Sequence, residues 1–301
     1  MEARFEASLG EKRRLVEEAL ERLLPSGPET PGVLAHGMRY AVIPGGKRLR
    51  PVLCLAACEA CGGEPARALA CACALEFVHA FSLVHDDLPA MDDDDLRRGQ
   101  PTCHKAFGEA MAILAGDALL PLAFQTLAKL DSPPQVVAQC CAVLAEATGA
   151  CQLVGGQADD VEGGPAASED VSSEEALARL ESIHRRKTGA MISVALALGG
   201  LIAWADPLQQ AALRQYGEHV GLAFQITDDV LDVRGDEATL GKRARKDSRR
   251  GKLTFPGLLG VEPSLRRAEE LIDGACEALA PLGPSAGALE ALARHVLDRN
   301  R

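Results

Sequence analysis

Two aspartate-rich segments are the strongest chemical signal in this sequence. The first spans residues 86–95 and contains Asp86, Asp87 and Asp92. These residues follow the predominantly apolar run 75–84, where a carboxylate without a counter-charge is costly to bury. A run of acidic residues alone usually forms a solvated loop. Because this run directly follows an apolar segment, we expect cations close to its first carboxylates. An EF-hand is excluded, because a loop counted from Asp92 lacks glycine at its sixth position and glutamate at its twelfth.

The second segment, residues 225–232, contains Asp228, Asp229 and Asp232 within another apolar helical pattern. Asp228 and Asp232 are four residues apart, so they share one helix face, about 6 Å from each other. Mg²⁺ usually binds one or two carboxylates and fills its other positions with water and substrate phosphates. The two segments together therefore predict facing helices with Mg²⁺ between them and a polyphosphate ligand.

Basic residues accompany both acidic segments. Any one of them could simply balance the aspartates, but as a set they predict two anion-binding surfaces, one formed through metal and one by direct contact with Lys and Arg. The residues concerned are Lys47 and Arg50 in a glycine-flanked turn, Arg97 and Arg98, Lys187 beside Thr188, and Lys242 and Lys252.

His79 is a further candidate, although a lone histidine in an apolar run is more often structural. His79, Ser82 and Asp86 are spaced by three and four residues, so all three point to the same side of a helix. This spacing favours a role for His79 beside the first metal carboxylate.

The elements that position these residues are predicted to be helices. Leu and Ala are abundant whereas aromatic residues make up 3% of the chain, and no segment alternates as a half-buried strand does. Apolar periodicity predicts helices over 5–24, 34–40, 49–61, 67–87, 105–130, 134–157, 173–186, 188–204, 207–232 and 264–301, with irregular segments at 159–172 and 235–251. The expected fold is a single all-α domain over residues 1–301.

The overall composition narrows the class of protein further. The net charge of −11 disfavours nucleic acid and anionic membrane as general partners. The 10 cysteines, with no apolar leader before them, are expected to be free thiols of a cytoplasmic protein. The longest uncharged stretch, 188–205, contains several glycines and alanines, so it is predicted to be a buried core helix and not a membrane span.

Five motifs in this order resemble the short-chain trans-polyprenyl diphosphate synthase family, and within it the bacterial farnesyl type. They are Gly-Gly-Lys-Arg-Leu-Arg-Pro from Gly45, Asp-Asp-x-x-x-x-Asp with Arg-Arg-Gly from Asp86, Lys-Thr-Gly from Lys187, Gln-x-x-Asp-Asp-x-x-Asp from Gln225, and Gly-Lys at Lys242. One departure is Gln100, where relatives often have Lys. The resemblance implies an isoprenoid-synthase helical bundle with a central cavity, and a homodimer.

The resemblance also implies a role for each candidate residue. Asp86, Asp87, Asp92, Asp228, Asp229 and Asp232 would hold about three Mg²⁺, which Mn²⁺ could replace, on an allylic diphosphate. Arg97, Lys187 and Lys242 would assist them, and Asp160 would have a secondary role. Isopentenyl diphosphate would be bound by Lys47, Arg50, His79 and Arg98, with Lys252 near the diphosphates. Thr188 and Gln225 would face a carbocation, formed when the allylic C–O bond breaks and attacked by the isopentenyl double bond.

Product length is expected to depend on Phe81 and Ser82. Phe81 lies five residues before Asp86, roughly 7.5 Å deeper along a helix, where a ring could close the floor beneath the growing chain. In the family, this pair together with the two extra residues of the first motif implies a fifteen-carbon product.

Several alternatives remain open at this level. Within the same reaction class, the chain could be a geranylgeranyl diphosphate synthase or a catalytically weak regulatory homologue. A terpene cyclase is a further alternative, but it binds no second diphosphate and so would not need the cations at 45–51. A Ca²⁺-buffering protein is the last alternative, and a diphosphate-release assay would distinguish it from a synthase.

Overall fold

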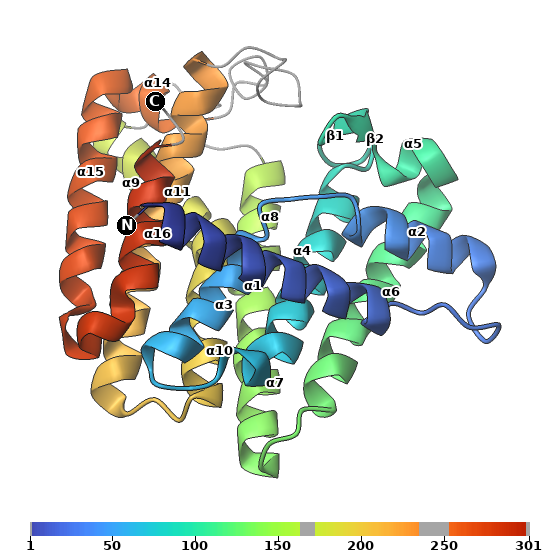
Figure 1. Cartoon of the computed structure of the whole chain (residues 1–301). Helices are drawn as coiled ribbons and strands as arrows, with labels where there is room; N and C mark the ends of the chain where they lie inside the picture. The colour runs from blue at the N-terminus through green and yellow to red at the C-terminus, as the bar shows by residue number, and fades with distance from the viewer. Residues whose placement is uncertain (1, 163–171, 235–252, 299–301) are drawn as a thin grey trace.

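The computed structural model describes residues 2–162, 172–234 and 253–298, which form a bundle of helices (Figure 1). The first half of the chain contains α1 (Glu2–Leu23), α2 (Gly32–Val42), α3 (Leu49–Ala60), the 3₁₀ turn η1 (Pro65–Ala68), α4 (Leu69–Asp86), α5 (Cys103–Phe107), α6 (Glu109–Ala128) and α7 (Pro134–Thr148). The second half contains α8 (Leu153–Val161), α9 (Ser173–His184), the π-helical turn η3 (Arg185–Gly189), α10 (Ala190–Ile202), α11 (Pro207–Arg234), α14 (Phe255–Leu259), α15 (Val261–Ala278), η4 (Ala280–Ala286) and α16 (Gly287–Asp298). The expected all-α class is confirmed.

The centre of the bundle is formed by α4 and α10, which are apolar on nearly every side. In α10, nine of the thirteen residues are buried, because α3, α7 and α11 pack around it. A helix without a polar face is stable in water only when neighbours cover it on all sides. The expected core helix in the uncharged stretch 188–205 is therefore confirmed, and α4 is covered in the same way by α3 and α6.

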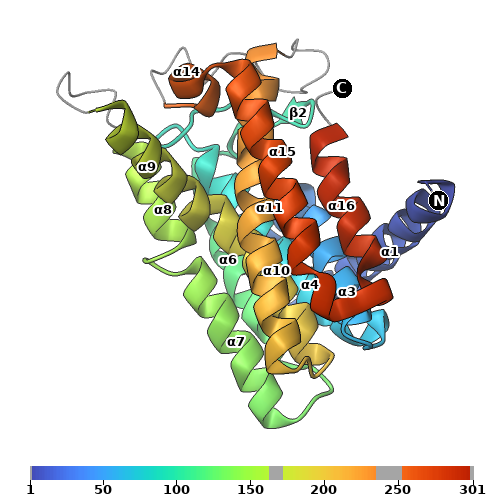
Figure 2. The ribbon, with the colours of Figure 1, turned by 90° about the vertical axis from the view of Figure 1, so that its left-hand side faces the viewer.

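The helices that contain the two acidic segments end on the same side of the bundle (Figures 1 and 2). Helix α4 ends at Asp86, and the 28-residue helix α11 contains Asp228 and Asp232 in its last two turns. A Ser172–Glu175 capping box fixes the start of α9, which continues into η3 and brings Lys187 and Thr188 to the same end.

One short hairpin departs from the expectation of helices alone. Strands β1 (Leu96–Arg97) and β2 (Gln100–Pro101) pair antiparallel, with Arg97 opposite Gln100. Arg98 and Gly99 between them both have positive φ, 53° and 77°, as a two-residue hairpin turn of this hand requires. Two-residue strands are too short to produce an alternating pattern, so they could not be predicted from hydrophobic periodicity.

Several predicted helices are divided in the structure. The block 105–130 is split between α5 and α6 at Gly108, whose φ of 83° cannot belong to a right-handed helix. The block 264–301 is interrupted near Gly283, where φ is 59°. Within 134–157, α7 ends at Thr148 and α8 begins at Leu153. The prediction of an irregular segment from residue 159 was therefore wrong for Asp159 and Asp160, which lie in α8.

Candidate functional site

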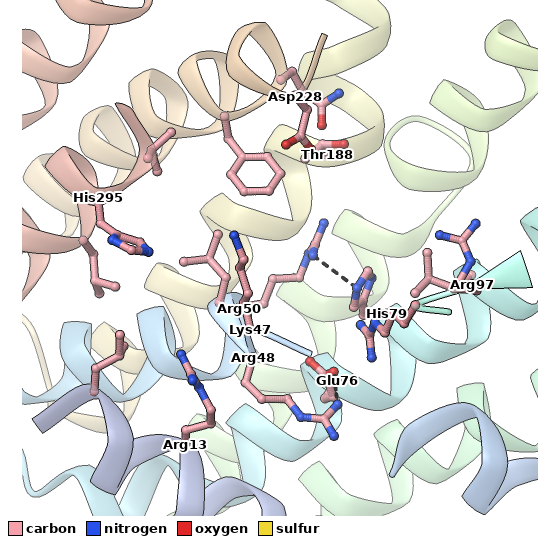
Figure 3. A pocket seen from close by; sticks show the side chains of 18 of the residues that line it. Arg13, Lys47, Arg48, Arg50, Glu76, His79, Arg97, Thr188, Asp228 and His295 are labelled. Atoms are coloured by element: carbon pink, nitrogen blue, oxygen red, sulfur yellow. Dashed lines mark hydrogen bonds and ion pairs between the residues drawn. The ribbon is translucent and has the colours of Figure 1, made fainter. Parts of the chain in front are cut away.

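A cavity of about 380 Å³ opens between the N-terminal part of the bundle and α11 (Figure 3). The turn before α3, helix α4, the β1–β2 hairpin, η3 and α11 each contribute side chains to it. Of the residues singled out in the sequence, the structure places eight around this one cavity: Lys47, Arg50, His79, Arg97, Arg98, Thr188, Gln225 and Asp228. Figure 3 shows the basic side chains on one wall and Asp228 with Thr188 on the other.

The turn that presents Lys47 and Arg50 is held by the residue between them, Arg48. Arg48 has a left-handed backbone, φ 48°, and its guanidinium is buried at 1% exposure. It donates to the Glu76 carboxylate at 2.5 Å and to the carbonyl oxygens of Val42 and Ile43 at 2.8 and 3.1 Å. Sequence reasoning assigned no role to Arg48 or Glu76. A single acidic residue inside the apolar run of α4 was the only available signal.

Arg50 and His79 meet inside the cavity, with Nη1 of Arg50 3.5 Å from Nε2 of His79. Burial lowers the pKa of His79 well below its ordinary value, and the neighbouring Arg50, Arg98, Arg97 and Arg48 lower it further. The imidazole is therefore neutral at pH 7. Burial also lowers the pKa of Arg50, although Glu76 and Asp228 oppose that shift. This wall of the cavity suits an anionic ligand, because a negative charge would compensate the cations buried there.

Asp87 and Arg97 bind each other, which the sequence analysis did not anticipate. Nε of Arg97 donates to both carboxylate oxygens of Asp87 at 2.9 and 2.8 Å, and Nη2 lies 2.5 Å from Oδ1. The Asp87 side chain is 4% exposed, and burial raises its pKa despite the hydrogen bonds from Arg97. In this structure Asp87 is therefore paired with Arg97, and its expected role as a metal ligand stays a prediction.

Asp86 lies on a different network, with Lys187. Nζ of Lys187 is 2.8 Å from Oδ2 of Asp160 and 3.7 Å from Oδ2 of Asp86. Burial raises the pKa of Asp86, and Lys187 only partly opposes this shift. The wide π-helical turn η3 carries Lys187 and Thr188, and such turns are often found at functional sites. Asp160 thus orients the lysine that faces the first acidic motif.

In the second acidic motif, the three aspartates have different surroundings. Asp228 lines the cavity, whereas Asp229 accepts a hydrogen bond from the backbone N–H of Phe255 at 3.0 Å. Oδ2 of Asp229 is also 3.6 Å from Nε2 of His184. Asp232 is buried at 4% exposure on the same helix face as Asp228. Asp229 therefore ties α11 to α14, and the structure does not bring its carboxylate into the cavity.

Sequence reasoning missed His184, which lies behind Gln225. Nδ1 of His184 is 3.2 Å from Nε2 of Gln225, and the imidazole stacks on Phe255 with ring centroids 5.7 Å apart. If Nδ1 accepts from the Gln225 amide, His184 carries its proton on Nε2, toward Asp229. The amide oxygen of Gln225 then points away from His184. Arg13 of α1 and His295 of α16 also line the cavity and could not be linked to it before the fold was known.

The remaining sequence candidates lie elsewhere. Phe81 packs edge-on against His85, and the Ser82 hydroxyl donates to the carbonyl oxygen of His79 at 2.9 Å, so neither lines this cavity. The backbone N–H of Asp92 donates to the carbonyl of Asp86 at 2.8 Å, which folds the acidic loop back over the end of α4. Lys242 and Lys252 lie outside the described residues.

The carboxylates fit a metal that is held partly by substrate. Among the described residues no three His, Cys, Asp or Glu side chains come close enough to form a complete protein cage. Asp86 and Asp228 nevertheless supply the oxygen ligands that hard divalent cations prefer. A cation near Asp86 would favour its ionised form, which burial disfavours. This donor set suits Mg²⁺ that completes its coordination with water and diphosphate oxygens.

Comparison with known proteins identifies relatives over most of the chain. Residues 31–278 match the polyprenyl synthetase family. A farnesyl diphosphate synthase from Escherichia coli is 46% identical, covering 94% of this chain and 95% of its own length. A geranylgeranyl diphosphate synthase from Cyanophora paradoxa is 42% identical over 97% of this chain and 95% of its own length. The crystal structure of an FPP/GFPP synthase from Zymomonas mobilis superposes with a TM-score of 0.86 at 35% identity, covering 99% of this chain and 100% of that one.

Proposed function

Because this chain belongs to the polyprenyl synthetase family and is a short-chain prenyltransferase acting on isoprenoid diphosphates, we propose that its product is farnesyl diphosphate. The reaction would join isopentenyl diphosphate to dimethylallyl or geranyl diphosphate. The allylic C–O bond breaks, a C–C bond forms from the isopentenyl double bond, and a proton is lost as diphosphate is released. The observation that carries the proposal is the single cavity with cations on one wall and Asp228 on the other.

The cationic wall would bind isopentenyl diphosphate directly. Lys47 and Arg50 flank the anchored Arg48, and Arg98 reaches the same space from the hairpin turn. Neutral His79 adds a ring nitrogen beside Arg50 without adding another buried charge. Direct charge-assisted hydrogen bonds from these residues need no metal.

Asp228 on the opposite wall would bind the allylic diphosphate together with Asp86, Asp92 and Asp232, which are not among the residues that line the cavity. Bound Mg²⁺ would neutralise the negative charge that develops on the leaving diphosphate. Lys187, held by Asp160, would place its ammonium group against the same diphosphate. We assign Asp87 and Asp229 to positioning, because they bind Arg97 and the Phe255 N–H respectively.

Between the two walls, Thr188 and Gln225 would stabilise the carbocation. Both line the cavity beside Asp228, and the contact between Gln225 and His184 directs the amide oxygen away from the histidine. Fixed oxygen dipoles of this kind stabilise positive charge without reorganising during the reaction. The released diphosphate is the proton acceptor in this scheme, so no protein base is required.

A geranylgeranyl product is the second candidate, because relatives with that activity are similarly close to this chain. Phe81, Ser82 and the first-motif insertion that contains Pro89 support the shorter product through the resemblance to the bacterial farnesyl type. Purified protein given Mg²⁺, isopentenyl diphosphate and each allylic primer in turn should accumulate the fifteen-carbon diphosphate. A main product of twenty carbons would overturn this part of the proposal.

We also propose that a second copy of the chain covers the outer face of α6. By length and composition, three described segments could span a membrane: 65–86, 109–128 and 134–161. The first is 61% buried in the bundle, whereas the second and third are 39% and 33% buried. Ile113 and Leu114 are 42% and 46% exposed on α6. Because α6 packs along α4 on its other side, its outer face is the part left exposed, and an apolar protein partner suits that face.

The solution mass of the protein tests this dimer. Leu114→Asp should yield a monomer in light scattering, because it places a charge in the apolar face. Val33→Asp, at a residue of α2 that is 50% exposed, is the matched control and should stay dimeric. A monomeric wild-type protein would contradict the proposal.

A cytoplasmic location of the protein also remains a prediction.

A further inference from the structure

His85 lies between Phe81 and helix α6, one residue before the first acidic motif. Its imidazole packs edge-on against the Phe81 ring, with centroids 4.9 Å apart and planes at 70°. On its other side, Nε2 lies 3.1 Å from the carbonyl oxygen of Ile113 in α6. The histidine therefore links Phe81, one helical turn earlier in α4, to the backbone of the neighbouring helix.

Gly116 provides the space that the imidazole occupies. A Cβ atom at this position would lie 2.2 Å from Nε2 and 2.5 Å from Cδ2 of His85. Both distances are far below any real contact, so an alanine here and this histidine rotamer exclude each other. The obstructing atoms are at the far end of a side chain, so an alanine could be accommodated by rotation of the imidazole without moving the backbone.

The contact with Ile113 fixes the ring in that space. The carbonyl of Ile113 can accept a hydrogen bond from this ring only through an N–H on Nε2, and Oδ1 of Asp117 lies 3.9 Å from the same nitrogen. The ring is therefore held at both ends, by a hydrogen bond to α6 and by the edge of an aromatic ring on α4. Phe81 itself has no hydrogen-bonding group, so the direction of its ring depends on what packs against it.

We propose that His85 is a positioning residue that sets product length by holding the Phe81 ring in place. This inference rests on the proposed function and deepens it, because the effect of Phe81 on chain length would depend on a second residue. Removing or rotating the imidazole leaves Phe81 free to turn into the space vacated beside α6. Phe81 does not line the cavity described above, so the floor that the family resemblance assigns to it would lie outside that cavity. Without the imidazole this floor would be less firmly held, and longer products would form.

The test compares product length in three variants: His85→Ala, Gly116→Ala, and the two substitutions combined. His36→Ala, at an exposed position of α2, is the matched control, and Phe81→Ala is the reference for an open floor. Products are measured by mass after incubation with isopentenyl and geranyl diphosphate, and melting temperature and total turnover are recorded separately. The ratio of twenty- to fifteen-carbon product should rise by a factor of about 2 to 10 in each single variant, as expected for loss of one aromatic edge contact.

The combined variant distinguishes an effect through His85 from a direct effect of the new methyl group. Once the imidazole is absent, an alanine at position 116 has nothing to displace, so the double variant should match His85→Ala. A further rise caused by Gly116→Ala in that background would show that position 116 acts without His85 and would overturn the proposal.

Failure of this inference can be separated from failure of the proposed function. Unchanged ratios in His85→Ala and Gly116→Ala, together with a shift in Phe81→Ala, would reject the role of His85 and leave the farnesyl assignment intact. An unchanged ratio in Phe81→Ala would reject both the role of Phe81 as the floor and the role of His85 in positioning it. A wild-type protein that makes mainly the twenty-carbon product would contradict the proposed function, whereas a ratio that still rises in both single variants would support the role of His85.

Discussion

Replacing Glu76 with alanine should destabilise the protein far more than a typical surface substitution does. The Arg48 and Glu76 side chains are 1% and 4% exposed, so the variant would leave a buried guanidinium without its carboxylate. Removing one partner of a buried ion pair costs about 3–5 kcal/mol in free energy of unfolding. The two carbonyl oxygens that also accept from Arg48 would remain, but they carry no charge. The Glu17 carboxylate, 3.9 Å from Nε of Arg48, is 46% exposed and compensates the buried charge only weakly.

Glu18→Ala is the matched control for this prediction. The Glu18 carboxylate also pairs with a cation, Arg14, at 2.6 Å, but the Arg14 and Glu18 side chains are 61% and 49% exposed. An exposed pair of this kind contributes about 0–1 kcal/mol. Thermal unfolding should therefore show a loss of about 6–10 °C for Glu76→Ala, at about 2 °C per kcal/mol for a chain of this size. The change for Glu18→Ala should be small.

Glu76→Ala should also change substrate binding. Without its anchor, the turn that contains Lys47 and Arg50 is less well positioned, so the KM for isopentenyl diphosphate should rise more than that for the allylic substrate. Equal destabilisation by Glu76→Ala and Glu18→Ala would refute the assignment of Arg48 as the buried anchor of the turn.

The remaining predictions concern the two walls of the cavity. Asp86→Asn and Asp228→Asn should each lower turnover by at least about 100-fold with the helical circular dichroism preserved, because each removes a charged oxygen ligand; near-normal rates in both would contradict the metal assignment. Lys47→Gln and Arg98→Gln should raise the KM for isopentenyl diphosphate most, and steady-state kinetics that show a rise only for the allylic substrate would reverse the division of the site. Because the pKa of His79 is lowered in the folded protein, the unfolded chain binds more protons below pH 6.5, so stability should fall with acidification by up to about 1.4 kcal/mol per pH unit. Denaturant unfolding at pH 7.5 and 5.5 should show a smaller loss in His79→Gln, and equal losses would reject the shift.

The residues that surround the cavity were largely predictable because their motifs are local. Lys47 and Arg50 share one turn, Thr188 follows Lys187, and Gln225 and Asp228 lie one helical turn apart. Each motif already contains the charged or polar groups that its residues present to the cavity. The fold had only to bring the ends of α4 and α11 to the same side, and the apolar patterns of those two helices predicted that they would be buried together.

The partners that hold those residues were not predictable, because each pairing joins distant parts of the chain. Arg48 and Glu76 are 28 residues apart, and His184 and Gln225 are 41 apart. Asp87 is chemically indistinguishable from Asp86 in the sequence, yet it is Asp87 that accepts the Arg97 hydrogen bonds once the hairpin has formed. The prediction of helix boundaries failed for a related reason. The break at Gly108 depends on tertiary packing as well as on residue type.

A calorimetric titration of each substrate with and without metal tests directly whether the cavity has a cationic and a metal-binding wall. We expect isopentenyl diphosphate to bind in EDTA nearly as tightly as in Mg²⁺, because Lys47, Arg50 and Arg98 would contact it directly. Geranyl diphosphate, held through the carboxylates of Asp86 and Asp228, should require Mg²⁺ for measurable binding. Tight binding of geranyl diphosphate in excess EDTA, or loss of isopentenyl diphosphate binding under the same condition, would contradict the division of the cavity into a cationic and a metal-binding wall.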